Sequence, residues 1–118
     1  MRAIILALLA MTTTVALADE ADDARRQAVS GRDAYWNCLA REYPRDSNRT
    51  LSEQDFGAMI EIACPSERQN FRVALVDFLG LQFPNNEAGA SMTTANNAIA
   101  LAQKDIVTAF VRRKAAAK

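Results

Sequence analysis

The sequence predicts a small all-α protein, a bundle of three or four helices with one intramolecular disulfide. Three observations point to this fold class. Apolar residues recur in steps of three and four, as on one face of a helix, and no run shows the period of two that is typical of strands. The chain has two cysteines, Cys38 and Cys64, and small exported domains often carry disulfides.

Residues 1–18 have the features of a secretory signal peptide. Arg2 supplies the positive start, residues 3–11 are all apolar, and Ala16 and Ala18 place small side chains where a signal peptidase reads them. A membrane span needs about 20 apolar residues, so an N-terminal anchor or a buried core helix is less favoured. We expect a periplasmic or secreted protein with a single helical domain over residues 19–118 and no transmembrane segment after cleavage.

The mature chain is nearly neutral. Cleavage removes Arg2, one of 14 bases, and leaves 13 bases against 14 acids, a net charge of −1. Binding to nucleic acid needs concentrated positive charge. Because the sequence has no basic stripe, we expect no nucleic-acid partner.

The first helix is predicted from about Asp22 to Tyr43. Pro44 ends it, because the residue before a proline is pushed out of the helical region. One apolar face, widened by a second row, consists of Ala21, Ala24, Ala28, Gly31, Tyr35 and Cys38, with Val29, Trp36, Leu39 and Tyr43. This spacing favours a core position for Trp36 over an exposed platform for carbohydrate or lipid.

The second helix is predicted from about Leu51 to Ala63. Residues 50–53 fit a capping box in which Thr50 is the N-cap and Glu53 reaches back to it. The predicted core face consists of Phe56, Met59, Ile60 and Ala63. Residues 48–50 also match an N-glycosylation sequon, a triplet that often arises by chance.

The third helix is predicted to begin at Pro65, which suits a first helical turn. Residues 71–79 are apolar on most sides of this helix, and a helix that is apolar all round is usually buried. We therefore expect the third helix at the centre of the bundle. The fourth helix is predicted from Ser91 or Met92 to Arg113, with Ser91 as its N-cap. Its core face consists of Ala95, Ile99, Ala102, Ile106 and Phe110.

Cys38 and Cys64 are expected to form the disulfide. In an oxidising compartment a single pair of cysteines is most simply one intramolecular bond. Loop-closure arithmetic gives it a stabilising contribution of roughly 3 to 3.5 kcal/mol. The alternatives are a redox centre, which normally has Cys-x-x-Cys spacing, and a zinc site, which needs further Cys or His ligands.

The residue inventory disfavours enzymatic chemistry. The chain has no histidine, the side chain most used for proton transfer near neutral pH. Glu61 and Asp77 have apolar neighbours and could work as a carboxylate pair, but acids are rarely buried, so solvated surface positions are the better interpretation. We expect no enzyme, no catalytic residue, no cofactor and no metal site.

Three short stretches carry a resemblance to known proteins. Residues 36–38 (Trp-Asn-Cys), Ala63-Cys64 and residues 67–71 together look like the small acid-activated chaperones of the Gram-negative periplasm. The chain is at least as similar to two-cysteine helical exported proteins of Alphaproteobacteria. The resemblance implies an all-helical exported protein with the cysteine pair bonded. The cysteines are closer together than in the chaperones, and residues 91–118 have no clear counterpart there.

Three functions are compatible with these patterns. The first is a non-enzymatic binding or interaction protein of the cell envelope, with Val73 and Val76 as part of a surface for a protein partner or client, if they are exposed. The second is a periplasmic acid-stress chaperone, because below about pH 3 most acids are neutral and the bases repel one another. The third is a small-molecule or lipid carrier with an apolar cavity between helices.

Overall fold

The fold is an all-α bundle, as predicted. The computed structural model describes the backbone of residues 9–117 and the side chains of residues 19–87 and 89–117. This part of the chain contains the helices α1 (Leu9–Ala40), α2 (Glu53–Ile62), α3 (Pro65–Gln82) and α4 (Ala88–Ala116), a short 3₁₀ helix η1 (Asp46–Asn48), and no strand.

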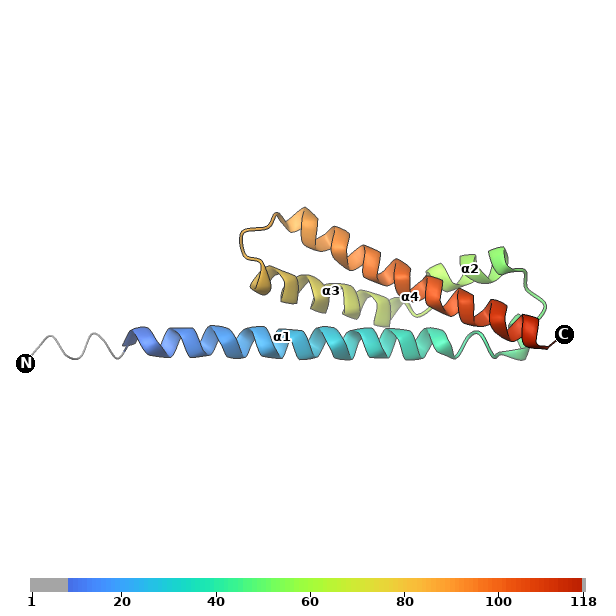
Figure 1. Cartoon of the computed structure of the whole chain (residues 1–118), viewed down its shortest axis with the longest axis horizontal. Coiled ribbons are helices and arrows are strands. Elements are labelled where there is room, and N and C mark those ends of the chain that lie inside the picture. Colours follow the sequence, from blue (N-terminus) through green and yellow to red (C-terminus); the bar gives the residue numbers. More distant parts are fainter. Residues whose placement is uncertain (1–8, 118) are drawn as a thin grey trace, which may run out of the picture.

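Helix α1 is the longest of these helices, and the other three lie along one side of it (Figure 1). Helix α3 runs alongside α1 in the opposite direction, and these two helices share the most extensive packing in the molecule. Helix α4 returns obliquely across α3 and α2 and also touches α1. The short helix α2 therefore packs mainly on α4.

The core lies where the four helices meet. Two aromatic contacts organise it: the rings of Phe56 and Phe110 stack with centroids 3.9 Å apart, and those of Tyr35 and Phe71 lie 6.4 Å apart. The hydroxyl of buried Tyr35 accepts a hydrogen bond from Gln103 Nε2 at 3.0 Å, so its polar group is not left unpaired. The buried core residues are Tyr35, Leu39, Phe56, Ile60, Phe71, Ile99, Ala102, Ile106 and Phe110.

Helix α1 ends at Ala40, three residues before the predicted end. Pro44 has no N–H to donate to the carbonyl of Ala40 and its ring crowds that carbonyl. The chain tightens instead, with Arg41 N and Glu42 N donating to carbonyls three residues back. The predicted signal peptide lies outside the fully described residues: residues 1–8 are not described, and of residues 9–18 only the backbone is, as part of α1.

Two predicted helix caps are wrong. The N-cap of α2 is Ser52, whose Oγ accepts a hydrogen bond from Asp55 N at 3.0 Å, and not Thr50. Leu51 packs against the core as the residue before the cap, and this places the helix start after it. Ser91 is not the N-cap of α4. That helix begins at Ala88 after Glu87, and Ser91 is buried inside it.

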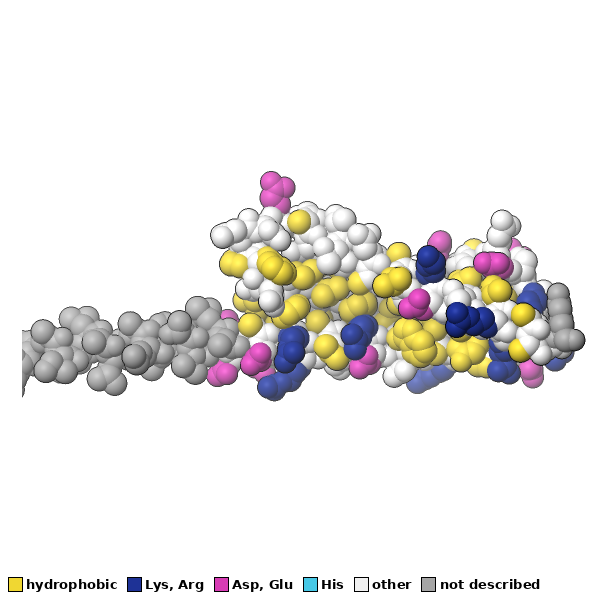
Figure 2. Space-filling view, in the orientation of Figure 1, with side chains coloured by type: hydrophobic (Ala, Val, Ile, Leu, Met, Phe, Trp, Pro, Cys, Tyr) yellow, Lys and Arg dark blue, Asp and Glu magenta, His cyan; other side chains and the backbone are white. Residues whose placement is uncertain are grey.

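Helix α3 is not at the buried centre of the bundle. Phe71 is its one fully buried side chain, while Val73 is 49% exposed. Figure 2 shows hydrophobic side chains gathered along α3 at the molecular surface. The core prediction for Trp36 is wrong as well, because this side chain is 40% exposed on α1. The side chains of Val73 and Trp36 therefore leave apolar surface in contact with solvent.

The close approach of α1 and α3 depends on Gly31. A Cβ atom added to Gly31 would lie 3.1 Å from the Cα of Phe71 and 3.5 Å from its backbone nitrogen. Backbone atoms cannot swing aside as the end of a flexible side chain can. The missing side chain at residue 31 therefore sets the distance between the two helices.

Gly31→Ala is expected to lower the free energy of unfolding by about 1 kcal/mol. Alanine gains about 1 kcal/mol in helix propensity over glycine, but overpacking typically costs about 1–3 kcal/mol. Gly80→Ala in α3 is the matched control. A Cβ there meets nothing within 4 Å, so we expect it to stabilise the protein by about 0.5–1 kcal/mol. Thermal melts followed by circular dichroism measure both, and equal stabilisation by the two variants would contradict the close approach.

Candidate functional site

The predicted disulfide joins Cys38 to Cys64, whose Cα atoms lie 6.2 Å apart. Cys38 lies in the last turn of α1, and Cys64 is the N-cap of α3. The bond therefore ties the end of one helix to the start of its main packing partner. Cys64 has a φ of 54°, the one positive φ among the non-glycine residues that the structure describes. This left-handed conformation is unfavourable for residues with a side chain.

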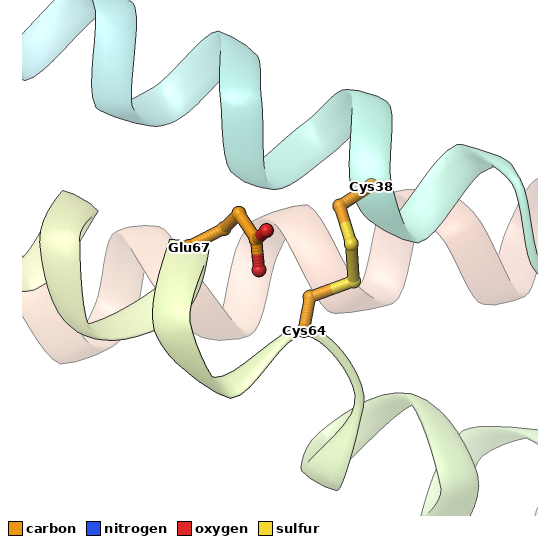
Figure 3. Close-up of side chains that lie close together, drawn as sticks. All are labelled: Cys38, Cys64 and Glu67. Carbon is orange, nitrogen blue, oxygen red and sulfur yellow. A yellow bond between two sulfur atoms is a disulfide. The ribbon is translucent and has the colours of Figure 1, made fainter.

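Glu67 extends from the first turn of α3 toward the disulfide (Figure 3). One carboxylate oxygen of Glu67 and the two sulfur atoms all lie within 4.8 Å of one another. The sulfurs are bonded to each other, whereas metal ions bind the thiolate form of cysteine. While the disulfide is intact, this cluster offers a metal ion a single carboxylate.

A shallow groove runs between α1 and α3, beginning beside Glu67. One wall consists of Gln27, Ser30 and Gly31 on α1, and the other of Asn70, Val73 and Asp77 on α3. Beyond Gln27 and Asp77 the groove continues between residues 20–24 of α1 and residues 76–81 of α3. We call it the α1–α3 groove.

Both residues of the predicted interaction surface line the α1–α3 groove. Val73 lies in its first part and is 49% exposed, and Val76 lies in its second part and is half-buried. On a helix with 100° per residue they point to the side away from buried Phe71. Ala74 and Leu81 add further apolar surface to the groove. Val73 is therefore exposed and Val76 partly so, and exposure is the condition under which the sequence made them candidates for an interaction surface.

The α1–α3 groove is lined by acidic side chains. Glu20, Asp23, Glu67 and Asp77 line it, and none of the described residues that line it is a lysine or an arginine. Asp23 is paired with Arg26 at 3.6 Å, in an exposed ion pair on α1. The groove thus combines exposed apolar side chains with carboxylates that come from two helices.

The two acids considered as a carboxylate pair are both exposed. Asp77 lines the α1–α3 groove, whereas Glu61 lies on α2, outside it. Exposure agrees with the interpretation of both as solvated surface acids. The backbone carbonyl of Glu61 accepts a hydrogen bond from Arg68 Nη1, which fastens the end of α2 to the start of α3.

Asn48, the sequon residue, has a structural role. Its side chain is buried, and Nδ2 donates hydrogen bonds to the carbonyl of Glu42 at 2.9 Å and to the carboxylate of Glu42 at 3.3 Å. Glycosylation would attach a bulky sugar to this same nitrogen. The arrangement disfavours Asn48 as a glycosylation site.

Sequence reasoning missed the acids of the groove. Glu20 and Asp23 were visible as part of an acidic start to the mature chain, but nothing local indicated that they face the strip around Val76 and Asp77. Their juxtaposition depends on the antiparallel packing of α1 and α3. A cluster of cations near the C-terminal end of α4 was missed as well, because it joins the segment after α1 to the last turns of α4.

None of the helices in the described part of the chain combines the length and the hydropathy needed to cross a membrane. Comparisons of the chain with protein-family models, with curated proteins and with solved structures gave no match.

Proposed function

We propose that the chain is a non-enzymatic binding protein of the cell envelope that takes a basic, amphipathic helix of a partner protein into the α1–α3 groove. The observation that carries the proposal is the exposed apolar strip of α3 in an acidic setting. The envelope location is supported by the features of residues 1–18 and by the disulfide, since disulfides persist in oxidising compartments.

We infer that the docked helix is basic because the groove that it would enter is acidic. The apolar side chains of a docked helix would cover Val73, Val76 and Leu81, and lysine or arginine side chains at its edges would meet Glu67 and Asp77. Helices dock into grooves in this way through an apolar face. Charges at the rim of such an interface raise the association rate and exclude partners of the wrong sign.

The length of the groove fits a short helix. From Glu67 to Leu81 the wall of α3 spans 14 residue steps, which is about 21 Å at 1.5 Å per residue. A docked antiparallel or parallel helix of similar length would make about four turns. A 16-residue peptide is therefore long enough to test the proposal.

We expect a fluorescein-labelled 16-residue peptide of leucine and lysine in helical spacing to bind the purified protein, as measured by fluorescence anisotropy. The same peptide with glutamate in place of lysine should bind at least about tenfold more weakly, because its charges repel those of the groove. Val73→Ser and Asp77→Lys should each weaken binding of the lysine peptide by about five- to tenfold, for lost apolar contact and for reversed charge respectively.

Two exposed residues of α4 provide matched controls: Leu101→Ser for the valine and Asp105→Lys for the aspartate. Neither residue lines the groove, and each control variant should bind within about twofold of the unchanged protein. An equal loss in variant and control would contradict the proposed site. Light scattering measures whether the protein is a dimer. A dimer that dissociates when Val73 is replaced by serine would mean that another copy of the chain occupies the groove. That result would overturn the proposal.

A further inference from the structure

A second hollow lies near the C-terminal end of α4, away from the α1–α3 groove. It has a volume of about 370 Å³, within the range of about 300–1,000 Å³ that small-molecule sites occupy. We call it the C-terminal pocket. The lining residues that matter for its chemistry are Tyr43, Arg45, Arg49, Phe110, Arg113 and Lys114.

The base of the C-terminal pocket is aromatic and fixed. Phe110 is 3% exposed and stacks on Phe56 in the core. Tyr43 is half-buried and packs against the same core. Phe110 therefore holds the pocket in place but offers almost no surface of its own, and half-buried Tyr43 is the aromatic side chain that a ligand can reach.

One wall is the segment that follows α1, and hydrogen bonds hold it in place. Asn48 is buried and donates through Nδ2 to the carbonyl of Glu42, which closes the segment on itself. The short helix η1 adds a backbone bond from Arg49 N to Asp46 O at 3.2 Å. Arg45 and Arg49 thus extend from an ordered wall, which lowers the cost of arranging them around a ligand.

The charge of the C-terminal pocket is strongly positive. Four cations line it, Arg45, Arg49, Arg113 and Lys114, against one acid, Asp46. The sum is four positive charges minus one negative charge, a local charge of +3 on a chain whose formal net charge is zero. This concentration is the opposite of the charge in the α1–α3 groove.

Two of the four cations already have partners. Arg45 lies 3.5 Å from the carboxylate of Glu42. Lys114 Nζ lies 5.3 Å from the centre of the Phe110 ring and donates a hydrogen bond to the carbonyl of Leu51. Among the residues that the structure describes, Arg49 and Arg113 have no carboxylate within 4.0 Å.

The helix dipole accounts for part of this cluster. Arg113 and Lys114 lie in the last turn of α4, where cations are favourable. Arg45 and Arg49 come from a different segment and have no such explanation. Their convergence on the same apolar base points to a ligand that is both anionic and apolar.

We propose that the C-terminal pocket binds an organic anion with an apolar body, of the kind represented by a medium-chain carboxylate. The guanidinium groups of Arg49 and Arg113 would hold the carboxylate, since the planar fork of arginine matches its two oxygens. The hydrocarbon would lie against Tyr43, Pro44 and Ala116, which line the pocket and are at least partly exposed. The site shares no residue with the α1–α3 groove, so the two proposals succeed or fail separately.

Calorimetric titration of the purified protein with octanoate, octanol and inorganic phosphate tests the proposal. We expect octanoate to bind with a dissociation constant below about 1 mM, and at least about tenfold more tightly than octanol or phosphate. Octanol has the apolar body without the charge, and phosphate has the charge without the body. Arg49→Gln and Arg113→Gln should each weaken octanoate binding by about fivefold or more.

Arg112→Gln is the matched control, because Arg112 is adjacent to Arg113 and exposed but does not line the pocket. This variant should bind octanoate within about twofold of the unchanged protein. Octanol binding as tight as octanoate would overturn the proposal, as would equal losses in Arg112→Gln and Arg113→Gln. If Arg113→Gln unfolds the protein, Arg49→Gln decides alone, because Arg49 lies outside the helices.

Discussion

Replacing both cysteines by alanine is expected to lower the free energy of unfolding by roughly 3 to 3.5 kcal/mol. The bond closes a loop between residues 26 apart in sequence, and the entropy of that loop in the unfolded chain is regained when the bond is lost. A domain of this size is stable by about 5–15 kcal/mol in total. Urea denaturation followed by the fluorescence of Trp36, the single tryptophan, measures the difference.

A second cysteine variant separates the cross-link from the backbone strain at Cys64. With φ at 54°, alanine at residue 64 is strained and glycine is not. Cys38→Ala with Cys64→Gly should therefore be more stable than Cys38→Ala with Cys64→Ala, by about 1 kcal/mol. A double-alanine protein as resistant to urea as the oxidised protein would show that the disulfide contributes no stability.

Phe110→Ala is expected to destabilise the protein by about 3–5 kcal/mol, as removal of a buried aromatic ring typically does. The ring is 3% exposed and stacks on Phe56, with 3.9 Å between centroids and 9° between planes. Its loss leaves a cavity between α2 and α4 and removes the surface over which Lys114 lies. The unfolding midpoints in heat and in urea measure the effect.

The adjacent residue serves as the control for Phe110. Val111 is 37% exposed, so Val111→Ala should cost less than about 1 kcal/mol. Similar losses in the two variants would mean that Phe110 is not the core contact between α2 and α4.

The helices and their buried faces could be predicted because they follow from local spacing. All five residues of the predicted face of α4, from Ala95 to Phe110, are buried. Pro65 is the first residue of α3, as expected from its fixed φ and missing N–H. The disulfide also followed from counting, because the chain contains two cysteines and no third thiol competes for either of them.

Helix starts were harder to predict, because several hydroxyl residues compete for each cap. Thr50 and Ser52 both precede an acidic residue by a suitable distance, and the burial of Leu51 favours Ser52. Ser91 has the chemistry of a cap, but the helix extends a turn further back to Ala88. Tertiary packing decides which of these residues becomes the N-cap, and a local sequence motif does not reveal tertiary packing.

The exposure of α3 and of Trp36 could not be predicted from spacing. An apolar pattern indicates which faces of a helix can be buried. The number of neighbouring helices decides how many of those faces are buried. The extensive packing of α3 is with α1 and α4, so the side around Val73 stays in solvent. The candidate sites were hidden for a related reason. Each joins charges that lie far apart in sequence, such as Glu20 with Asp77, and Arg45 with Arg113.

The α1–α3 groove is the surface that we propose binds the partner helix. The most direct test of this proposal is a titration of ¹⁵N-labelled protein with the leucine–lysine peptide, followed by amide chemical shifts. We expect shifts confined to residues 20–34 of α1 and residues 67–81 of α3. Shifts centred on residues 43–49 and 110–117, shifts spread over the solvent side of α4, or no shifts at all would contradict it.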